Sequence, residues 1–131
     1  MRKIWIADDD DAIRLILEES LGNAGFITKM FSNGEDLIKE LDYEKPDLII
    51  TDVQMPGMLG YDILKHVSNN YEDLPVIIMT AFADMQAAVE SFGGGAFEYI
   101  PKPFDLDEAI KIIRRALEEK PITKGLKKDV K

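Results

Sequence analysis

Apolar residues along the chain are grouped in five short runs, and a stretch with apolar residues at helical spacing follows each run. The runs Leu48–Ile50 and Leu74–Met79 consist almost entirely of apolar residues, most of them branched. Such runs are typical of strands that are buried on both faces of a sheet. The five predicted strands are Lys3–Ala7, Phe26–Met30, Leu48–Ile50 with its continuation to Asp52, Leu74–Met79 and Phe97–Ile100.

The stretches after these runs predict five helices. In the first of them, Ile13, Leu17, Leu21 and Ala24 recur at helical spacing, and we place Ile16 on the same buried side. The first predicted helix begins at Asp10 or Asp11 and ends near Gly22 or Gly25. The other four are Ser32–Leu41, Tyr61–Asn69, Asp84–Phe92 and Asp105–Leu117.

Two helix starts show the spacing of a capping box. Ser32 is followed three residues later by Glu35, and Asp105 is followed by Glu108. In this motif the first side chain accepts a hydrogen bond from the backbone of the third helical residue. The fourth helix is expected to end at Gly93–Gly95, because glycine is common just after a helix.

The strict alternation of strands and helices predicts an α/β fold. We expect a doubly wound, five-stranded parallel sheet of the flavodoxin-like (βα)5 type, with helices on both faces and strand order 2-1-3-4-5. In that order the winding reverses between strands 1 and 3, where a crevice forms at the carboxyl ends of the strands. Strand 1 leads to Asp8 and Asp9, and strand 3 leads to Asp52. The topology therefore predicts that these three carboxylates meet.

Composition narrows the possible functions. The chain has 131 residues, which suits one core, and it contains no cysteine, so disulfides and thiolate metal sites are excluded. No apolar run approaches the roughly 20 residues that a membrane helix needs, and we expect a cytoplasmic protein. The net charge of −9 argues against nucleic-acid binding by this domain.

The last residues differ from the rest of the chain. Pro121 breaks the helical pattern, and residues 120–131 contain five lysines and one aspartate. We therefore divide the chain into a domain at residues 1–119 and a Lys-rich linker or tail at residues 120–131.

Four consecutive carboxylates, Asp8 to Asp11, follow the first strand. Helix capping alone would require one of them. Together with Asp52, they form an oxygen-only cluster of the kind that suits Mg²⁺. An EF-hand is excluded because the loop lacks the central glycine, and Ile13 takes the place of an oxygen ligand.

Two more polar residues are predicted at the same edge of the sheet. Thr80 ends the fourth strand, and Lys102 follows the fifth. With the carboxylates they provide a nucleophile, a metal site, a hydroxyl donor and an ammonium group, which are the components of phosphoryl transfer to Asp52. Lys102 lies between two prolines, and we expect a cis peptide bond between Lys102 and Pro103.

These residues form a recognisable combination. Asp8-Asp9, Asp52 with Met55-Pro56-Gly57, Thr80-Ala81 and Lys102-Pro103-Phe104 resemble the receiver domain of bacterial two-component response regulators. The resemblance covers residues 3–119, and the stretches 76–81 and 95–105 are most similar to the NtrC class.

The resemblance implies a role for each residue. Asp52 would accept a phosphoryl group from a sensor histidine kinase. Asp8, Asp9, Asp52 and the backbone carbonyl of Gln54 would bind Mg²⁺. Lys102 would contact the phosphoryl group. Thr80 would turn towards that group, and Tyr99 would change rotamer with it.

The resemblance also implies an output. Phosphorylation would switch the surface formed by helix 4, strand 5 and helix 5, and thereby control ATPase and DNA-binding domains that activate transcription with the alternative sigma factor sigma-N. A homodimer on activation is possible in such a scheme. The domain would be a signalling switch and not an enzyme, beyond phosphoryl transfer to its own Asp52 and self-dephosphorylation.

Three alternatives remain at this point. The first is a stand-alone receiver that acts through protein–protein contact. The second is a haloacid-dehalogenase-like phosphatase, which would need a second aspartate where Gln54 stands. The third is a flavodoxin-like FMN carrier, which would need a hydroxyl- and glycine-rich loop where Asp8 to Asp11 stand.

Overall fold

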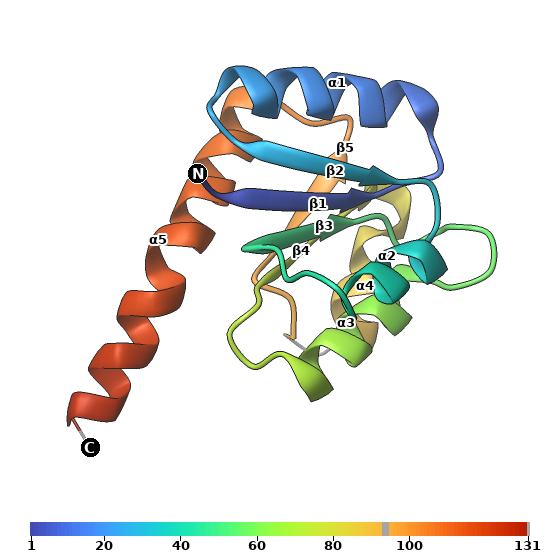
Figure 1. Cartoon of the computed structure of the whole chain (residues 1–131). Helices are drawn as coiled ribbons and strands as arrows, with labels where there is room; N and C mark the ends of the chain where they lie inside the picture. Colours follow the sequence, from blue (N-terminus) through green and yellow to red (C-terminus); the bar gives the residue numbers. More distant parts are fainter. Residues whose placement is uncertain (93–94, 131) are drawn as a thin grey trace.

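The strands form one parallel sheet in the order β2-β1-β3-β4-β5, which confirms the predicted fold class. This arrangement is seen in a computed structural model that describes residues 1–92 and 95–130 (Figure 1). The strands are β1 (Lys3–Ala7), β2 (Ile27–Phe31), β3 (Leu48–Thr51), β4 (Val76–Ala81) and β5 (Glu98–Lys102).

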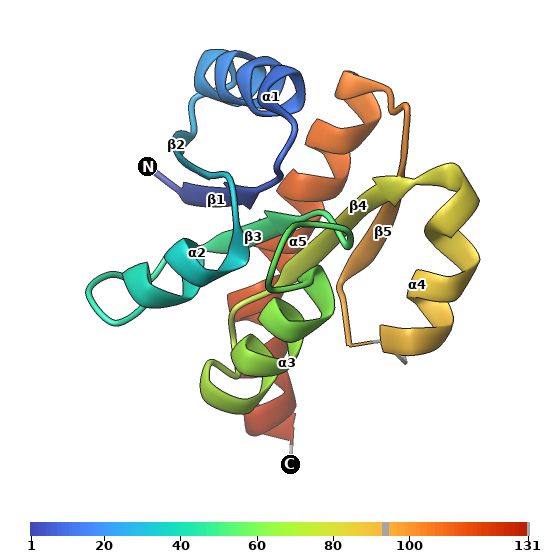
Figure 2. The same ribbon diagram turned by 90° about the vertical axis from the view of Figure 1, so that its right-hand side faces the viewer.

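Helices cover both faces of the sheet, with α1 and α5 on one face and α2, α3 and α4 on the other (Figure 2). Within the described residues none of them is both long and apolar enough to cross a membrane. The helices are α1 (Asp11–Asn23), α2 (Gly34–Glu40), α3 (Gly60–Asn70), α4 (Met85–Phe92), which a short 3₁₀ turn (Phe82–Asp84) precedes, and α5 (Leu106–Val130).

Each face of the sheet has its own hydrophobic layer, because side chains alternate between the faces along every strand. Along β1, Trp5 packs toward α2 and α3, whereas Ile4 and Ile6 pack toward α1 and α5. All four residues of β3 are buried. This burial explains why the apolar run was continuous and did not alternate with polar residues.

The register of the central strands sets the position of the acidic residues. Ala7 of β1 is opposite Thr51 of β3, so the next residues, Asp8 and Asp52, leave the sheet side by side. The backbone N–H of Asp52 donates to the carbonyl of Ala7 at 3.0 Å. The crevice predicted between strands 1 and 3 therefore begins directly above a hydrogen-bonded strand pair.

Two helix starts confirm the predicted caps, and one corrects a prediction. The Asp10 side chain caps α1, and the Asp105 side chain accepts hydrogen bonds from the first turn of α5. The predicted capping box at Ser32 is wrong, because Asn33 caps α2 and accepts from the N–H of Asp36 at 2.8 Å. Both Ser32 and Asn33 can cap a helix, and α2 begins at Gly34, directly after Asn33.

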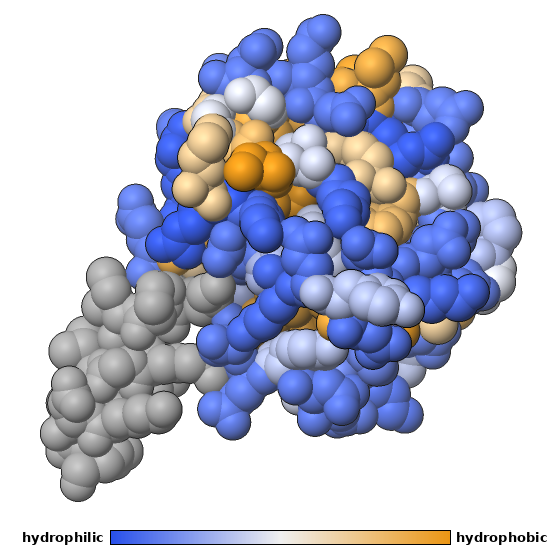
Figure 3. Space-filling view, in the orientation of Figure 1, coloured by the Kyte–Doolittle hydropathy of each residue, from blue (hydrophilic) through white to orange (hydrophobic). Residues whose placement is uncertain are grey.

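The buried side of α1 is narrower than predicted. Leu17 and Leu21 are buried, but Ile16 is 44% exposed. Successive helical residues are separated by about 100°, which turns Ile16 away from the stripe through Leu17 and Leu21. Figure 3 shows that some apolar side chains lie at the surface near α1 and β2, on a face that is otherwise mostly hydrophilic.

The last two elements are longer than predicted. Strand β5 includes Pro101 and Lys102, which were expected in a loop. Helix α5 continues through Pro121 to Val130, so the prediction that Pro121 breaks the helix is wrong. The proline ring fixes φ near −65°, a helical value, although it removes one hydrogen-bond donor. The predicted end of the fourth helix at Gly93 and Gly94 lies outside the described residues.

Candidate functional site

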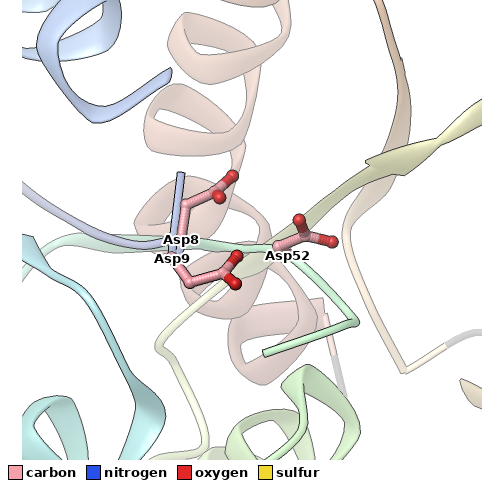
Figure 4. Close-up of side chains that lie close together, drawn as sticks. All are labelled: Asp8, Asp9 and Asp52. Carbon is pink, nitrogen blue, oxygen red and sulfur yellow. The ribbon is translucent and has the colours of Figure 1, made fainter. Parts of the chain in front are cut away.

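Three carboxylates meet at the carboxyl ends of β1 and β3. Each of Asp8, Asp9 and Asp52 offers a carboxylate oxygen, and these atoms all lie within 4.8 Å of one another (Figure 4). Asp8 and Asp52 are buried, with 2% and 8% exposure, whereas Asp9 is exposed. The cluster thus has a buried side within the sheet edge and an open side toward solvent.

Lys102 connects the two buried carboxylates. Its ammonium nitrogen lies 2.7 Å from Asp8 Oδ2 and 2.7 Å from Asp52 Oδ2. The Lys102 side chain is 17% exposed. Its peptide bond to Pro103 is cis, as predicted. One cation therefore bridges two of the three acids and leaves a cluster with excess negative charge.

Burial and charge act in opposite directions on these groups. Burial raises the pKa of Asp8, and this effect outweighs the hydrogen bonds from Lys102 and the Asp10 N–H. Burial alone would lower the pKa of Lys102, but its hydrogen bonds to Asp52 and Asp8 and the charges of both acids raise the pKa overall. Lys102 thus remains an ammonium at neutral pH, whereas burial makes the ionised form of Asp8 less favourable than it is in water.

Arg14 also belongs to this site, and the sequence analysis did not identify it. Its guanidinium donates to the backbone carbonyl of Asp8 at 2.6 Å and pairs with the Asp11 carboxylate. The signal in the sequence is an arginine in the first turn of a helix that four aspartates introduce. Arg14 fixes the loop between β1 and α1 without touching the carboxylates of Asp8 or Asp52 in the contacts described.

The other three predicted site residues, Gln54, Thr80 and Tyr99, lie around this cluster in the loop after β3, on β4 and on β5, respectively. Gln54 follows Asp52 by two residues, and its N–H donates to Asp52 Oδ1 at 3.3 Å. Thr80 is fully buried at the end of β4, one residue before Ala81, which pairs with Lys102. Tyr99 pairs with Ile78 further down β5 and packs against the core layer on the α2, α3 and α4 face.

The Thr80 hydroxyl is an unusual buried group. It has no hydrogen-bond partner within the part of the chain that the structure describes. Leaving such a group unpaired typically costs about 1–3 kcal/mol, so an orphan hydroxyl invites a functional explanation. Its strand end is next to the strand that carries Lys102.

The donor set fits Mg²⁺. All three side chains of the cluster provide hard oxygen ligands, and their excess negative charge needs a second cation besides Lys102. Mg²⁺ usually keeps several waters, so a site with few protein ligands and an open side is suitable. The exposed Asp9 marks the open side of the cluster.

Comparison with known proteins gives a consistent result. The family profile of the response regulator receiver domain matches residues 4–114. The DNA-binding transcriptional regulator NtrC of Escherichia coli is 45% identical over 114 residues, which are 87% of this chain and 24% of that protein. The chain thus spans about a quarter of the length of the NtrC relatives that it matches.

Solved structures agree with the sequence comparison. The apo receiver domain of nitrogen regulatory protein C has a TM-score of 0.82 and 43% identity, covering 90% of this chain and 95% of that one. The response regulator TrrA of Thermotoga maritima, solved in complex with Mg²⁺ and BeF, has a TM-score of 0.80 and 29% identity, covering 88% of this chain and 99% of that one.

Proposed function

The chain belongs to the response regulator receiver domain family, and from this premise we propose that it receives a phosphoryl group from a sensor histidine kinase on Asp52. Family membership supports a phosphoacceptor role for the domain. Two strand-end carboxylates, Asp8 and Asp52, belong to the acidic cluster and pair with Lys102. One observation supports Asp52 as the acceptor: it is the more exposed of the two, at 8% against 2%.

The chemical step is a displacement at phosphorus. A carboxylate oxygen of Asp52 attacks the phosphorus atom, and the bond from phosphorus to the donor nitrogen breaks. The electron pair of that bond remains with the histidine of the kinase, and Asp52 becomes an acyl phosphate. Lys102, at 2.7 Å from Asp52, is placed to pair with the negative oxygens of the transferred group.

We propose Mg²⁺ as the cofactor, bound by Asp8, Asp9, Asp52 and the backbone carbonyl of Gln54. When bound, the ion supplies charge neutralisation at the phosphoryl oxygens. Asp8 holds Lys102 from the buried side of the site, and the exposed Asp9 completes the site on the solvent side. The Gln54 N–H orients Oδ1 of Asp52, the oxygen that does not pair with Lys102.

The switch follows from Thr80 and Tyr99 in this proposal. The unpaired Thr80 hydroxyl gains a partner when it turns to the phosphoryl group. That movement vacates space that Tyr99 can enter, and α4 shares a core layer with Tyr99 through Ala88. A hollow of about 510 Å³, lined by residues that include Gln54 and Ala87, separates the loop after β3 from α4 and gives α4 room to shift.

The output belongs to a longer protein in this proposal, because the NtrC relatives are about four times as long as the matched region. Residues 1–119 act as the receiver, and residues 120–131 lead toward ATPase and DNA-binding domains. The switched surface of α4, β5 and α5 controls these domains in the cytoplasm, in transcription activation with sigma-N and with a homodimer as the active form. The receiver itself does not bind nucleic acid and is not an enzyme beyond its own phosphorylation and dephosphorylation.

The test is incubation of the purified chain with acetyl phosphate and Mg²⁺. We expect one phosphoryl group per chain, in an acid-stable and base-labile adduct, and no adduct with Asp52→Asn. Asp11→Asn is the matched control, because Asp11 lies in the same acidic run but outside the cluster. Labelling of Asp52→Asn at the wild-type level would contradict the assignment, and sustained turnover of a phosphate ester would indicate a phosphatase.

A further inference from the structure

The backbone carbonyl of Asp52 lies in unusually close contact with the start of α3. A Cβ atom built on Gly60 would lie 2.2 Å from the Asp52 carbonyl oxygen and 3.0 Å from the Asp52 carbonyl carbon. The positive-φ glycines of the described chain are Gly25 and Gly57, so Gly60 is not required by its backbone conformation. The requirement at Gly60 is the close approach of two backbone segments.

Hydrogen bonds hold this peptide group and the peptide groups on either side of it. The Thr51 hydroxyl, which is fully buried, donates to the Asp52 carbonyl at 2.9 Å. The Asp52 N–H donates to Ala7, and the Gly60 N–H donates to the Val53 carbonyl, both at 3.0 Å. The backbone on both sides of the acceptor is therefore fixed by β1, by Thr51 and by the first residue of α3.

We infer that Gly60 and Thr51 are positioning residues, which fix the peptide after Asp52 and thereby aim the Asp52 carboxylate and the Gln54 carbonyl. The inference rests on the proposed role of Asp52 as the acceptor. Neither residue touches the transferred group. They act because the Asp52 side chain reaches Lys102 at 2.7 Å from a backbone that these contacts hold in place.

An alanine at Gly60 must displace one of two backbone segments. The built Cβ is nearly 1 Å closer to the carbonyl oxygen than real Cβ contacts are, so either α3 or the peptide after Asp52 has to move by a similar distance. A misplacement of about 1 Å at a reacting group can reduce a rate by about 100-fold.

Gly34 provides a matched control. A Cβ built there would lie 3.1 Å from Ile63 Cδ1 and 3.2 Å from Met58 Cβ, which are side-chain atoms in the packing between α2 and α3. Gly34→Ala is the same substitution at a crowded helix start, yet it leaves the Asp52 backbone untouched. A loss of stability alone would affect both variants, whereas a loss of positioning would affect only Gly60→Ala.

The experiment compares Gly60→Ala, Gly34→Ala, Thr51→Val and Thr51→Ser with the wild type. It measures the melting temperature, the amide NMR shifts of residues 52–54 without metal, and the labelling rate with saturating acetyl phosphate and Mg²⁺. We expect Gly60→Ala to label about 10- to 100-fold more slowly and Thr51→Val several-fold more slowly, with shifted amides in both. We expect Gly34→Ala and Thr51→Ser to label within about 2-fold of the wild type even where they melt earlier, because the Thr51→Ser variant retains the hydroxyl.

Wild-type labelling rates and unshifted amides in Gly60→Ala and Thr51→Val would overturn the inference. Equal slowing by Gly34→Ala and Gly60→Ala would also overturn it, since the effect would then follow stability. If Gly60→Ala does not fold, the pair Thr51→Val and Thr51→Ser decides. A wild type that takes up no phosphate contradicts the proposed function instead, and the amide shifts then still test whether Gly60 and Thr51 fix the peptide.

Discussion

Lys102 and Asp52 form an ion pair at 2.7 Å, although 50 residues separate them in the chain. The pair exists because parallel strands deliver their carboxyl ends to one edge of the sheet. The same ammonium lies 2.7 Å from Asp8, so it offsets repulsion between two buried acids before any other cation arrives. Lys102, the residue that would meet the phosphoryl group in the proposed function, thus also has a structural role in this state of the protein.

We expect Lys102→Met to destabilise the metal-free protein by about 1–3 kcal/mol. Methionine retains most of the apolar stem but leaves Asp8 and Asp52 buried without their cation, and such a loss is costly even at a partly open site. The measurement is urea unfolding, together with the rate of labelling by acetyl phosphate, which should fall.

Lys45→Met is the control for Lys102→Met. Lys45 pairs with Asp73 at 2.7 Å, but both side chains are more than 40% exposed. An exposed pair of this kind contributes about 0–1 kcal/mol. Equal effects of the two substitutions on stability, or normal labelling of Lys102→Met, would show that the site does not depend on its ammonium.

Mg²⁺ should stabilise the chain, and the effect should depend on the three clustered carboxylates. A ligand that binds only the folded state at ten times its dissociation constant adds roughly 1.4 kcal/mol. We expect the melting temperature to rise with millimolar Mg²⁺ in the wild type and in Asp11→Asn, and to rise much less in Asp9→Asn. The exposed Asp9 can be changed with little effect on the core, which separates metal binding from folding.

A melting temperature that does not respond to Mg²⁺ would contradict a shared metal site.

A further check is Asp52→Asn without metal. Removing this negative charge leaves Lys102 paired with Asp8, so repulsion in the cluster falls. We expect the metal-free variant to be more stable than the wild type by roughly 1 kcal/mol.

Glu44 should give a small acid-sensitive contribution to stability. Its hydrogen bonds and ion pairs with Lys3 and Lys29 lower its pKa from the ordinary value of 4.5. A lowered pKa in the folded state means that the contribution is present above pH 4.5 and is lost as the pH falls through the folded-state pKa.

The check compares the wild type with Glu44→Gln by urea unfolding from pH 7 to pH 2. We expect Glu44→Gln to be less stable at neutral pH and the difference to disappear in acid. High salt should reduce the difference as well, because the group is at the surface. A difference that grows as the pH falls would give the opposite sign and contradict this interpretation.

Those features of the fold and site that depend on local pattern could be predicted from the sequence. The buried run before Asp52 and the topology rule for parallel sheets were sufficient to bring Asp8, Asp9 and Asp52 together. The prolines on both sides of Lys102 led to the prediction of a cis peptide bond before Pro103, and that bond is present.

The remaining features depend on contacts between segments. Asn33 and Ser32 are both good capping residues, so the local pattern did not decide between them, and Asn33 caps α2 in the structure. Arg14 looks like a surface residue until the loop after β1 brings the Asp8 carbonyl to its guanidinium. The need for glycine at Gly60 was hidden for the same reason, since its φ is ordinary and the obstacle is the carbonyl of Asp52.

The two buried threonines of the site should respond in opposite ways to valine. Thr51 donates to the Asp52 carbonyl, whereas the Thr80 hydroxyl has no hydrogen-bond partner among the described residues. Replacing a paired hydroxyl by a methyl group costs about 0.5–1.5 kcal/mol, whereas replacing an unpaired one can be neutral or stabilising. We therefore expect Thr51→Val to lower the free energy of unfolding and Thr80→Val to leave it unchanged or raise it by up to about 1 kcal/mol.

Thr80→Val should also disconnect the site from α4. In the wild type with Mg²⁺, beryllofluoride should change amide shifts in residues 80–92 and 95–104 more than in residues 11–45. The reason is that Thr80 lies in β4 and Tyr99 lies in the neighbouring strand β5. In Thr80→Val the changes around Asp52 should persist, while those in α4 and β5 should be much smaller. If the largest wild-type changes fall on α1 and α2, or if Thr80→Val responds like the wild type, the unpaired hydroxyl of Thr80 is not the link between phosphorylation and the output surface.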